Sequence, residues 1–217
     1  MLKTPDVKAS YHHGDLRRAL VDASLEILTS RDVADLSLRE VARRAGVSPA
    51  APYHHFGGKA ELLAAIAVEA YGLLEERMRL AVAGTDEGGA TLRDCVRAYV
   101  RFALEQPSHF RVMHHAELRN GETHEELAKA RQSIWQFLAE VLRGDPVKKD
   151  FLIEAGNEST LLCLAWATAH GLATLCLDGY LGSKLSMPFD VAQEPEAVAD
   201  AVSALLATLV DTALRRG

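Results

Sequence analysis

The chain has 217 residues, of which 48% are hydrophobic and 25% are charged, a composition that suits one large or two small globular domains with a real core. The formal net charge is −6, but residues 1–62 carry nine Lys or Arg against eight Asp or Glu, so the acidity belongs to the rest of the chain. Overall acidity therefore does not exclude a nucleic-acid partner for the N-terminal part.

Three cysteines, Cys95, Cys163 and Cys176, form no C-x-x-C pair. An odd and sparse set argues against the disulfide framework of a small secreted protein. We expect small buried hydrophobic residues here, with a redox-sensing thiol as the alternative.

Residues 1–13 form a polar arm without the apolar stretch of a signal peptide. Ser159–Leu177 approaches the length of a membrane-spanning helix. However, it contains Ser, Thr and His, acidic Glu158 and Asp178 bound it, and no basic anchor lies close by. We therefore expect a buried or dimer-interface helix, no membrane partner and a cytoplasmic location.

Helical signals run along nearly the whole chain, and no strand pattern stands out. Asp15 can cap a first helix, whose apolar face holds Leu16, Leu20, Ala23, Ile27 and Leu28. After a polar connection, Ser37-Leu-Arg-Glu40 reads as a capping box that opens a second helix, in which Glu40 reaches back to the cap. Gly46 ends this helix, because glycine adopts the left-handed conformation at little cost.

A third, short helix is predicted from Pro49, which suits a first helical position, with Ser48 as its cap and Gly57-Gly58 at its end. Two short helices joined by a tight glycine turn form a helix-turn-helix, whose second helix fits the DNA major groove. Six further helices are predicted at residues 60–82, 91–105, 107–118, 125–142, 158–177 and 196–215. The fold class is thus all-α with about nine helices, and the Gly-rich stretch 83–90 is the expected domain boundary.

The stretch SLREVARRAGVSPAAPYHHFGGKAELLAAI, residues 37–66, resembles the signature of the tetracycline-repressor (TetR) family of transcription regulators. About ten positions agree in order and spacing, and the resemblance covers about residues 13–66. It implies a DNA-binding unit at 1–60, linked through helix 60–82 to an effector-binding and dimerisation unit at 83–217. It also implies a double-stranded DNA operator, a homodimer and an unknown small-molecule effector.

The family pattern assigns DNA contacts by position. Phosphate contacts fall on Tyr53, His55 and Lys59, and on Ser37 in addition to its capping role. Base contacts fall on Ser48, Ala50, Ala51 and His54. Arg39, Arg43 and Arg44 flank the DNA backbone on or beside the second helix.

One position departs from the family pattern. Pro52 stands where Leu or Ile is usual, and as the fourth helical residue it removes the bond to the Ser48 carbonyl and crowds that oxygen. We therefore expect a distorted first turn in the third helix.

Downstream, AWATAHGLATL at residues 165–175 is similar to the Trp-x-x-x-His-Gly signature of one TetR C-terminal subgroup. Trp166 and His170 share a helix face, and Gly171 permits a close neighbouring helix. The residues expected at an effector pocket are Phe102, Phe110, Met113, Trp135, Trp166 and His170. The residues expected at a dimer interface are Leu161, Ala201, Leu205, Thr208, Leu209 and Thr212.

Plainer readings stay open for each of these groups. The aromatic set is equally compatible with ordinary core, and Arg97 with Arg101 fits either an anion site or a solvated face. His54 and His55 point about 100° apart on a helix and do not chelate one metal together. His114 with Glu117 has a spacing that suits one ion, although surface or pocket histidines are the simpler reading. We predict no metal and no cofactor.

An enzyme is the rival class, but the chain lacks G-x-S-x-G, H-E-x-x-H, P-loop and Rossmann glycine motifs. A third reading is an adaptor protein with an inactive helix-turn-helix. We predict a sequence-specific DNA-binding regulator that is not an enzyme: a repressor released from a near-palindromic operator by an effector.

Overall fold

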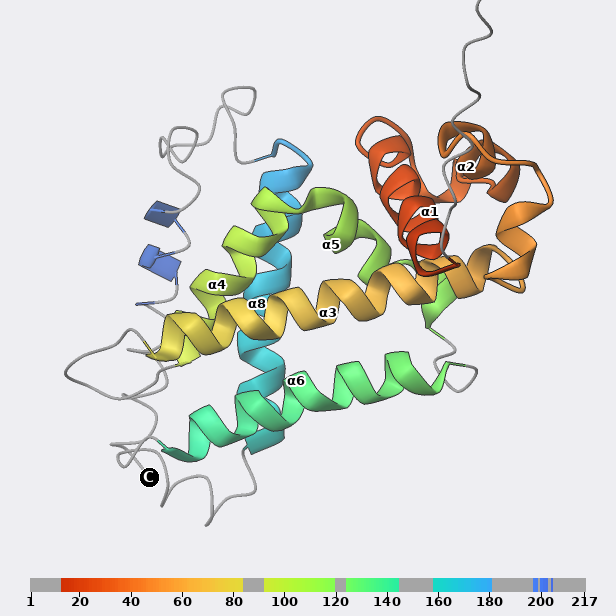
Figure 1. Ribbon diagram of the computed structural model, residues 1–217. Helices are drawn as coiled ribbons and strands as arrows, with labels where there is room; N and C mark the ends of the chain where they lie inside the picture. The colour runs from red at the N-terminus through yellow and green to blue at the C-terminus, as the bar shows by residue number, and fades with distance from the viewer. Residues whose placement is uncertain are drawn as a thin grey trace, which may run out of the picture.

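The computed structural model describes residues 13–83, 92–119, 124–144, 158–180, 197–198, 200–202 and 204. Within these ranges all regular secondary structure is helical, which confirms the all-α fold class (Figure 1). Most of the predicted arm, most of the 83–90 boundary and most of the last helix lie outside the described residues. The same holds for four expected interface residues, Leu205, Thr208, Leu209 and Thr212.

The N-terminal elements form a small unit, residues 13–58, which we call the head. It contains α1 (His13–Ile27), η1 (Val33–Asp35), α2 (Leu38–Arg44) and η2 (Ala51–His54). Helix α1 begins two residues before Asp15, the expected cap. Its predicted apolar face is correct, since Leu20, Ala23, Ile27 and Leu28 are buried and Leu16 packs beside them.

Helix α3 (Lys59–Ala83) leaves the head and runs across the whole molecule (Figure 1). Its buried positions recur from Leu62 to Met78 and face the other helices at both ends. This recurrence gives one continuous cluster of buried side chains, from Leu20 in α1 to Ala173 in α8. Head and body therefore share a core, because α3 contributes to both.

The C-terminal elements form the body, residues 92–180. They are α4 (Leu92–Glu105), α5 (Pro107–Met113), η3 (Ala116–Leu118), α6 (Glu125–Gly144) and α8 (Glu158–Leu177). Helix α3 packs against α4, α5 and α6, and α4 packs against α8, which crosses behind α3 in the view of Figure 1.

The single helix predicted at 107–118 is interrupted. Helix α5 ends at Met113, and His115 is extended with φ −65° and ψ 144° before η3 begins. The break places His114 and Glu117 on different elements, so the helical spacing behind the metal alternative is not formed. The turn also carries His114 toward the interior of the body, as described below.

Helix α8 is long and apolar enough to cross a membrane by length and composition, with a mean hydropathy of 1.6, and only 22% of that window is buried. Such a single helix is weak evidence of a membrane span. Its exposed large apolar side chains are Leu164, Trp166 and Leu175. Cys163 on the same helix is exposed too, contrary to the expectation for all three cysteines, whereas Cys95 is buried and Cys176 partly so.

Candidate functional site

The start of α2 is capped by Ser37, whose Oγ accepts a hydrogen bond from the Glu40 amide at 3.3 Å. The capping-box prediction also had the Glu40 carboxylate bonding back to the Ser37 amide, and this bond is not formed. The carboxylate pairs instead with Arg31 at 3.1 Å and lies 3.7 Å from Arg43. A carboxylate binds a charged guanidinium more strongly than a neutral amide. Of the two capping-box hydrogen bonds, only the one accepted by Ser37 Oγ therefore forms.

The turn after α2 is built as predicted around Gly46, which has φ 71°. The Gly46 amide donates to the Arg43 carbonyl at 3.3 Å, and the Val47 amide donates to the Ala42 carbonyl at 2.9 Å. These two bonds are the Schellman arrangement of a helix end. They set the direction in which the chain leaves α2.

The recognition segment that follows is not the α-helix expected from Pro49. It is a turn leading into η2, a four-residue 3-10 helix with no side-chain cap. The cause is Pro52, which has no N–H to give the Ser48 carbonyl. That carbonyl accepts instead from Ala51 at 3.0 Å, and Tyr53 donates to Ala50 at 3.2 Å, both with three-residue spacing.

The distortion expected from Pro52 is thus present, and it extends over the whole segment. Pro52 itself is buried. It therefore takes the inward apolar place that the resemblance gives to Leu or Ile. Tyr53, by contrast, is 56% exposed, and Phe56 is 1% exposed beneath the Arg17 guanidinium, 5.2 Å from the ring centre.

The predicted DNA-contacting residues share one property, which is that none has a buried side chain. The exposed ones are Ser37, Arg39, Arg43, Ser48, Ala50, Tyr53 and His54, and the partly buried ones are Ala51, His55 and Lys59.

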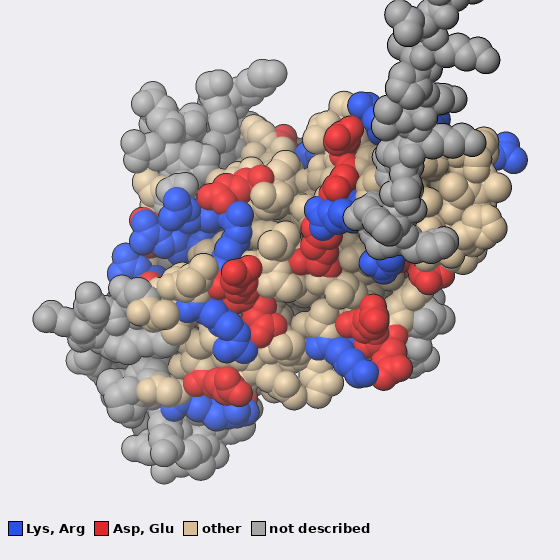
Figure 2. Space-filling view, in the orientation of Figure 1, with Lys and Arg blue, Asp and Glu red and all other residues tan. Residues whose placement is uncertain are grey.

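Charge on the head is largely balanced by local pairs. Arg43 lies near Glu40, and Arg44 pairs with Glu26 at 3.5 Å, whereas Arg39 makes no ion pair within the described ranges. In the body, Figure 2 shows basic and acidic side chains interspersed over α3 and α6, and basic side chains gathered at the left, over α4.

Lys59, the first residue of α3, joins the head to the body. Its Nζ donates to the Ala34 carbonyl at 2.8 Å and lies 3.4 Å from an oxygen of Glu117 in η3. Sequence reasoning placed Lys59 near DNA but did not anticipate Glu117, because the two residues are far apart in the chain.

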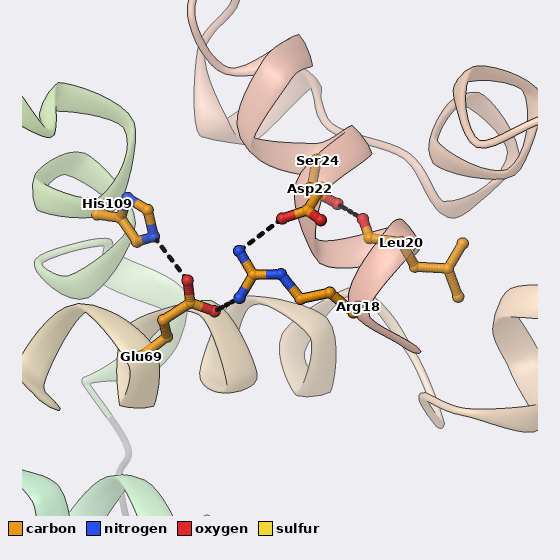
Figure 3. Close-up of polar contacts among 6 residues, drawn as sticks. All are labelled: Arg18, Leu20, Asp22, Ser24, Glu69 and His109. Carbon is orange, nitrogen blue, oxygen red and sulfur yellow. Dashed lines mark hydrogen bonds and ion pairs between the residues drawn. The ribbon is translucent and has the colours of Figure 1, made fainter. Parts of the chain in front are cut away.

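A second polar link joins α1, α3 and α5 (Figure 3). Glu69 accepts from Arg18 at 2.8 Å and lies 3.4 Å from Nε2 of His109, and Arg18 also pairs with Asp22 at 2.6 Å. Hydrogen bonds to Asp22 and Glu69 raise the pKa of Arg18, while burial lowers the pKa of His109 against the opposing effect of Glu69. No sequence motif predicted this group of charged residues.

The body contains a cavity of about 440 Å³ between α3, α4, α6, α8 and the segment after α5. Four of the expected pocket residues line it: Met113, Trp135, Trp166 and His170. The other two, Phe102 and Phe110, do not. Phe102 is fully buried beside Arg77, and Phe110 packs behind the polar cluster, 4.9 Å from the His114 ring.

A polar cluster of Tyr99, His114 and His170 forms one wall of this cavity. The Tyr99 hydroxyl lies 2.9 Å from Nε2 of His114 and 3.0 Å from Nδ1 of His170. Because a hydroxyl has one proton, it donates to one imidazole and accepts from the other. Both remaining ring nitrogens are left for other partners.

Burial governs the charge of this cluster. It lowers the pKa of His114 to about 3, reinforced by the nearby charges of His170 and Arg131. It also lowers the pKa of His170 and raises that of Tyr99, where a hydrogen bond from Trp166 acts in the opposite direction. All three groups are therefore neutral near pH 7. Burial likewise raises the pKa of the Cys95 thiol on the cavity wall to about 12.

The two tryptophans of the chain both line the cavity and are partly exposed. Their rings lie 6.0 Å apart at an interplanar angle of 77°, and Trp166 stacks on His170 at 5.7 Å. This arrangement presents apolar faces next to the polar cluster.

Two of the expected interface residues lie within the described ranges. Leu161 is partly buried and packs against the cluster of Ala139, Leu142 and Leu162 within the same chain. Ala201 is exposed. No group of three His, Cys, Asp or Glu gathers at a metal-sized spacing in the part of the chain that the structure describes.

Comparison with known families agrees with this geometry. Residues 20–66 match the family described as bacterial regulatory proteins, tetR family, and residues 92–202, slightly more than half of the chain, match the tetracyclin repressor-like C-terminal domain. The chain belongs to the TetR family. It is a DNA-binding transcriptional regulator, as the helix-turn-helix residues predicted, while membership of the Trp-His-Gly subgroup stays a prediction.

Several solved structures share the fold. A protein of unknown function from Rhodococcus sp. RHA1 is 27% identical, with a TM-score of 0.67 over 92% of this chain and 97% of that one. The fatty acid degradation regulator FadR from Bacillus halodurans is 16% identical, with a TM-score of 0.67 over 90% and 96%. FadR from Bacillus subtilis, in complex with stearoyl-CoA, is 18% identical, with a TM-score of 0.55 over 87% and 96%.

Proposed function

We propose that this TetR-family regulator is a cytoplasmic homodimeric repressor, released from a near-palindromic operator when a small molecule enters the cavity of the body. In this proposal residues 1–60 are the DNA-binding unit, and residues 83–217 bind the effector and the second subunit. Helix α3 joins the two units.

The DNA contacts of the proposal follow the exposed groups of the head. Tyr53 and His54 are exposed on η2, which packs against α2, and Ser37 and Arg39 are exposed at the capped start of α2. Ala50 precedes η2 and Ala51 begins it, and both have small side chains. In this proposal the DNA bases are therefore recognised through methyl contacts and His54. Two such segments in a dimer would meet successive major grooves about 34–36 Å apart.

The observation that supports the effector role is that residues 114–119 contact both the cavity and the head. His114, His115 and Arg119 line the cavity, and Glu117, between them, lies 3.4 Å from Lys59 at the head. A ligand that displaces this segment changes the partner of Lys59. The Glu69 group offers a second route, because it joins α5 to α1 through Arg18.

The energy that this coupling requires is modest. An effector that favours one arrangement of head and body by about 1–3 kcal/mol changes DNA affinity by roughly 5–150-fold. A solved relative, Bacillus subtilis FadR, carries a ligand, stearoyl-CoA, which supports a ligand-responsive role on a similar fold. The class of regulator also favours binding over catalysis, so we propose no enzymatic activity.

The DNA role is tested by selecting bound duplexes from a random pool, followed by anisotropy titrations with and without candidate ligands. The coupling is tested with Glu117→Gln, which removes the charge opposite Lys59. Because an exposed pair contributes about 0.2–1 kcal/mol, the ratio of DNA affinities without and with ligand should fall by roughly 1.4- to 5-fold.

The matched control is Glu126→Gln, which removes an exposed carboxylate on α6 that forms no ion pair within the described residues. An equal ratio in Glu117→Gln and the native protein would remove the Glu117 route from the proposal. Failure to enrich any sequence would favour the adaptor reading with an inactive head.

The homodimer is proposed from α8. Exposed apolar positions recur along this helix at Leu164, Ala167, Gly171 and Leu175, at spacings of three or four residues. Such a row suits a helix of a second subunit. Gly171 has nothing within 4 Å of an added Cβ, so a close-packed neighbour there must come from outside the described residues.

The dimer is tested with Gly171→Arg. An added Cβ at Gly171 meets no atom within 4 Å, whereas a long charged side chain there would block a closely packed partner helix. Gly72→Arg is the control, because Gly72 is also an exposed helical glycine with nothing within 4 Å. We expect sedimentation to show more monomer for Gly171→Arg alone. A dimer of native strength in Gly171→Arg would place the interface elsewhere.

A further inference from the structure

The cavity wall has an unusual charge composition. Two arginines, Arg119 and Arg131, and three histidines line it, whereas no Asp, Glu or Lys does so within the described residues. Neither arginine forms an ion pair in that part of the chain. Many other described arginines do pair with carboxylates, such as Arg18, Arg77 and Arg143. Among the described residues, the cavity wall therefore carries positive charge without a carboxylate counter-ion.

Arg131 is the better placed of the two arginines. It is partly buried, it donates to the Leu118 carbonyl at 3.0 Å, and its guanidinium lies 5.8 Å from the Tyr71 ring centre. These contacts occupy one of its five N–H groups and hold it beside the cavity. Its charge is also close enough to help lower the pKa of His114. The guanidinium thus adjoins the wall formed by Tyr99, His114 and His170.

From this arrangement we infer that the effector is an organic anion, a monocarboxylic acid with a compact apolar or aromatic body. Its carboxylate pairs with Arg131, and its body packs against the two tryptophans. The inference rests on the proposed effector role of the cavity and names the chemical class of its ligand.

Three physical reasons support this class. An anion enters a largely apolar cavity only if a charged, hydrogen-bonding partner repays its desolvation, and a guanidinium does so with two parallel bonds. The imidazole that accepts the Tyr99 proton keeps an N–H on its other ring nitrogen, and this N–H is oriented to donate one further hydrogen bond to the carboxylate. The volume of about 440 Å³ lies in the range usual for small-molecule sites, and the largely apolar wall with two tryptophans suits a compact apolar body.

The chain provides its own reporter for a test. Trp135 and Trp166 are its two tryptophans, and both line the cavity, so intrinsic fluorescence reports its occupancy. The probes are 4-phenylbutanoate, its neutral amide and the corresponding primary amine, titrated into the full-length protein without DNA. We expect the acid to bind about ten- to a hundredfold tighter than the amide, and the amine to bind weakest.

Three variants locate the effect. Arg131→Met should remove the preference for the acid while leaving amide binding in place, and Arg131→Lys should restore part of the preference. Arg111→Met is the control, because Arg111 is exposed on α5 and does not line the cavity. Retained amide binding shows that the cavity of the Arg131→Met variant is folded. If that variant loses helicity, the acid preference of Arg131→Lys decides whether residue 131 binds the carboxylate.

The outcomes separate the ligand class from the proposed function. If the amide or amine binds as tightly as the acid, or if Arg131→Met keeps the preference for the acid, the class is wrong. If a neutral ligand then releases DNA, the proposed function stands without this class. If the acid binds through Arg131 but leaves DNA affinity unchanged, the class stands and the effector role of the cavity fails.

Discussion

The head and the body bring their functional groups together in different ways. In the head, the exposed groups of the recognition segment come from neighbouring residues, and Tyr53 and His54 sit side by side on one turn. In the body, Tyr99, His114 and His170 come from α4, the end of α5 and α8. The head is thus set by local backbone geometry, whereas the body depends on how its helices pack.

The two regions differ in packing as well. Phe56 closes the head with 1% exposure, and the body instead leaves a cavity of about 440 Å³ beside its core. A closed head presents a constant surface to DNA, while an incompletely filled body can adapt to a ligand. The contrast suggests that changes in the head alter stability sharply and changes at the cavity wall alter response.

The largest expected effect is in the head. Phe56→Ala should destabilise the protein by about 3–5 kcal/mol, because it removes a fully buried aromatic ring from the core. Urea unfolding measures the loss. The control Tyr53→Ala changes a ring that is 56% exposed, so stability should move by no more than about 0.5 kcal/mol while DNA affinity falls. Similar destabilisation by both changes would contradict the assignment of inner and outer faces.

The next effect concerns the turn. Gly46→Ala should cost about 1–2 kcal/mol, because Gly46 has φ 71° and a Cβ is strained there. Gly72→Ala should have the opposite sign and stabilise by up to about 1 kcal/mol, since Gly72 is an exposed residue in the middle of α3. Thermal unfolding compares the pair. If Gly46→Ala stabilised the protein as Gly72→Ala does, the turn after α2 would have to relax when Gly46 is substituted.

A smaller effect tests the junction between the regions. Lys59→Ala should weaken DNA binding on all sequences alike and reduce the salt slope by about one unit, if Lys59 contacts a phosphate. Its present partners, Ala34 and Glu117, must then give way on the DNA. The measurement is affinity against salt concentration on two unrelated duplexes. An unchanged slope would leave Lys59 with a structural role only.

A further expected effect lies in the body and depends on pH. His114 has a pKa of about 3 when folded against 6.5 for the free group, so the unfolded chain binds more protons between these values. Stability should therefore fall as the pH drops below about 6.5, and His109 and His170 act in the same direction.

His114→Gln, which keeps a hydrogen-bonding partner for Tyr99, should reduce this loss. Each kcal/mol corresponds to about 2–4 °C in Tm for a chain of this size. The groups that face His114 are Tyr99 on α4, His170 on α8 and Arg131 on α6. An equal fall in Tm between about pH 7.5 and pH 5 in both proteins would show that His114 is solvated.

Much of the fold was predictable because its signals are local. Ser37 and Gly46 mark the ends of α2, and the apolar spacing of α8 located that helix at residues 158–177 without error. The recognition segment was harder. Pro52 indicated a distortion, but whether one turn or the whole helix would change depends on the neighbouring carbonyls and on burial of the ring.

The candidate site was predictable only in part. Trp166 and His170 were found because they share a helix face, and Met113 and Trp135 also line the cavity. Tyr99, His114 and Arg131 were not assigned to a cavity, since nothing in the sequence reveals which faces of α4 and α6 meet α8. Phe110 was placed in the pocket, whereas it packs behind the polar cluster.

By itself, the sequence determined the helical class, the turn at Gly46 and the exposed groups that follow it, because caps, glycines and apolar periodicity act within a few residues. Only the tertiary structure decided that Glu117 meets Lys59, that Glu69 joins Arg18 to His109, and that Arg131 adjoins the neutral histidines of the cavity wall. These contacts join residues from different helices. Their formation depends on how long helices pack around a shared core, and no local pattern encodes that packing.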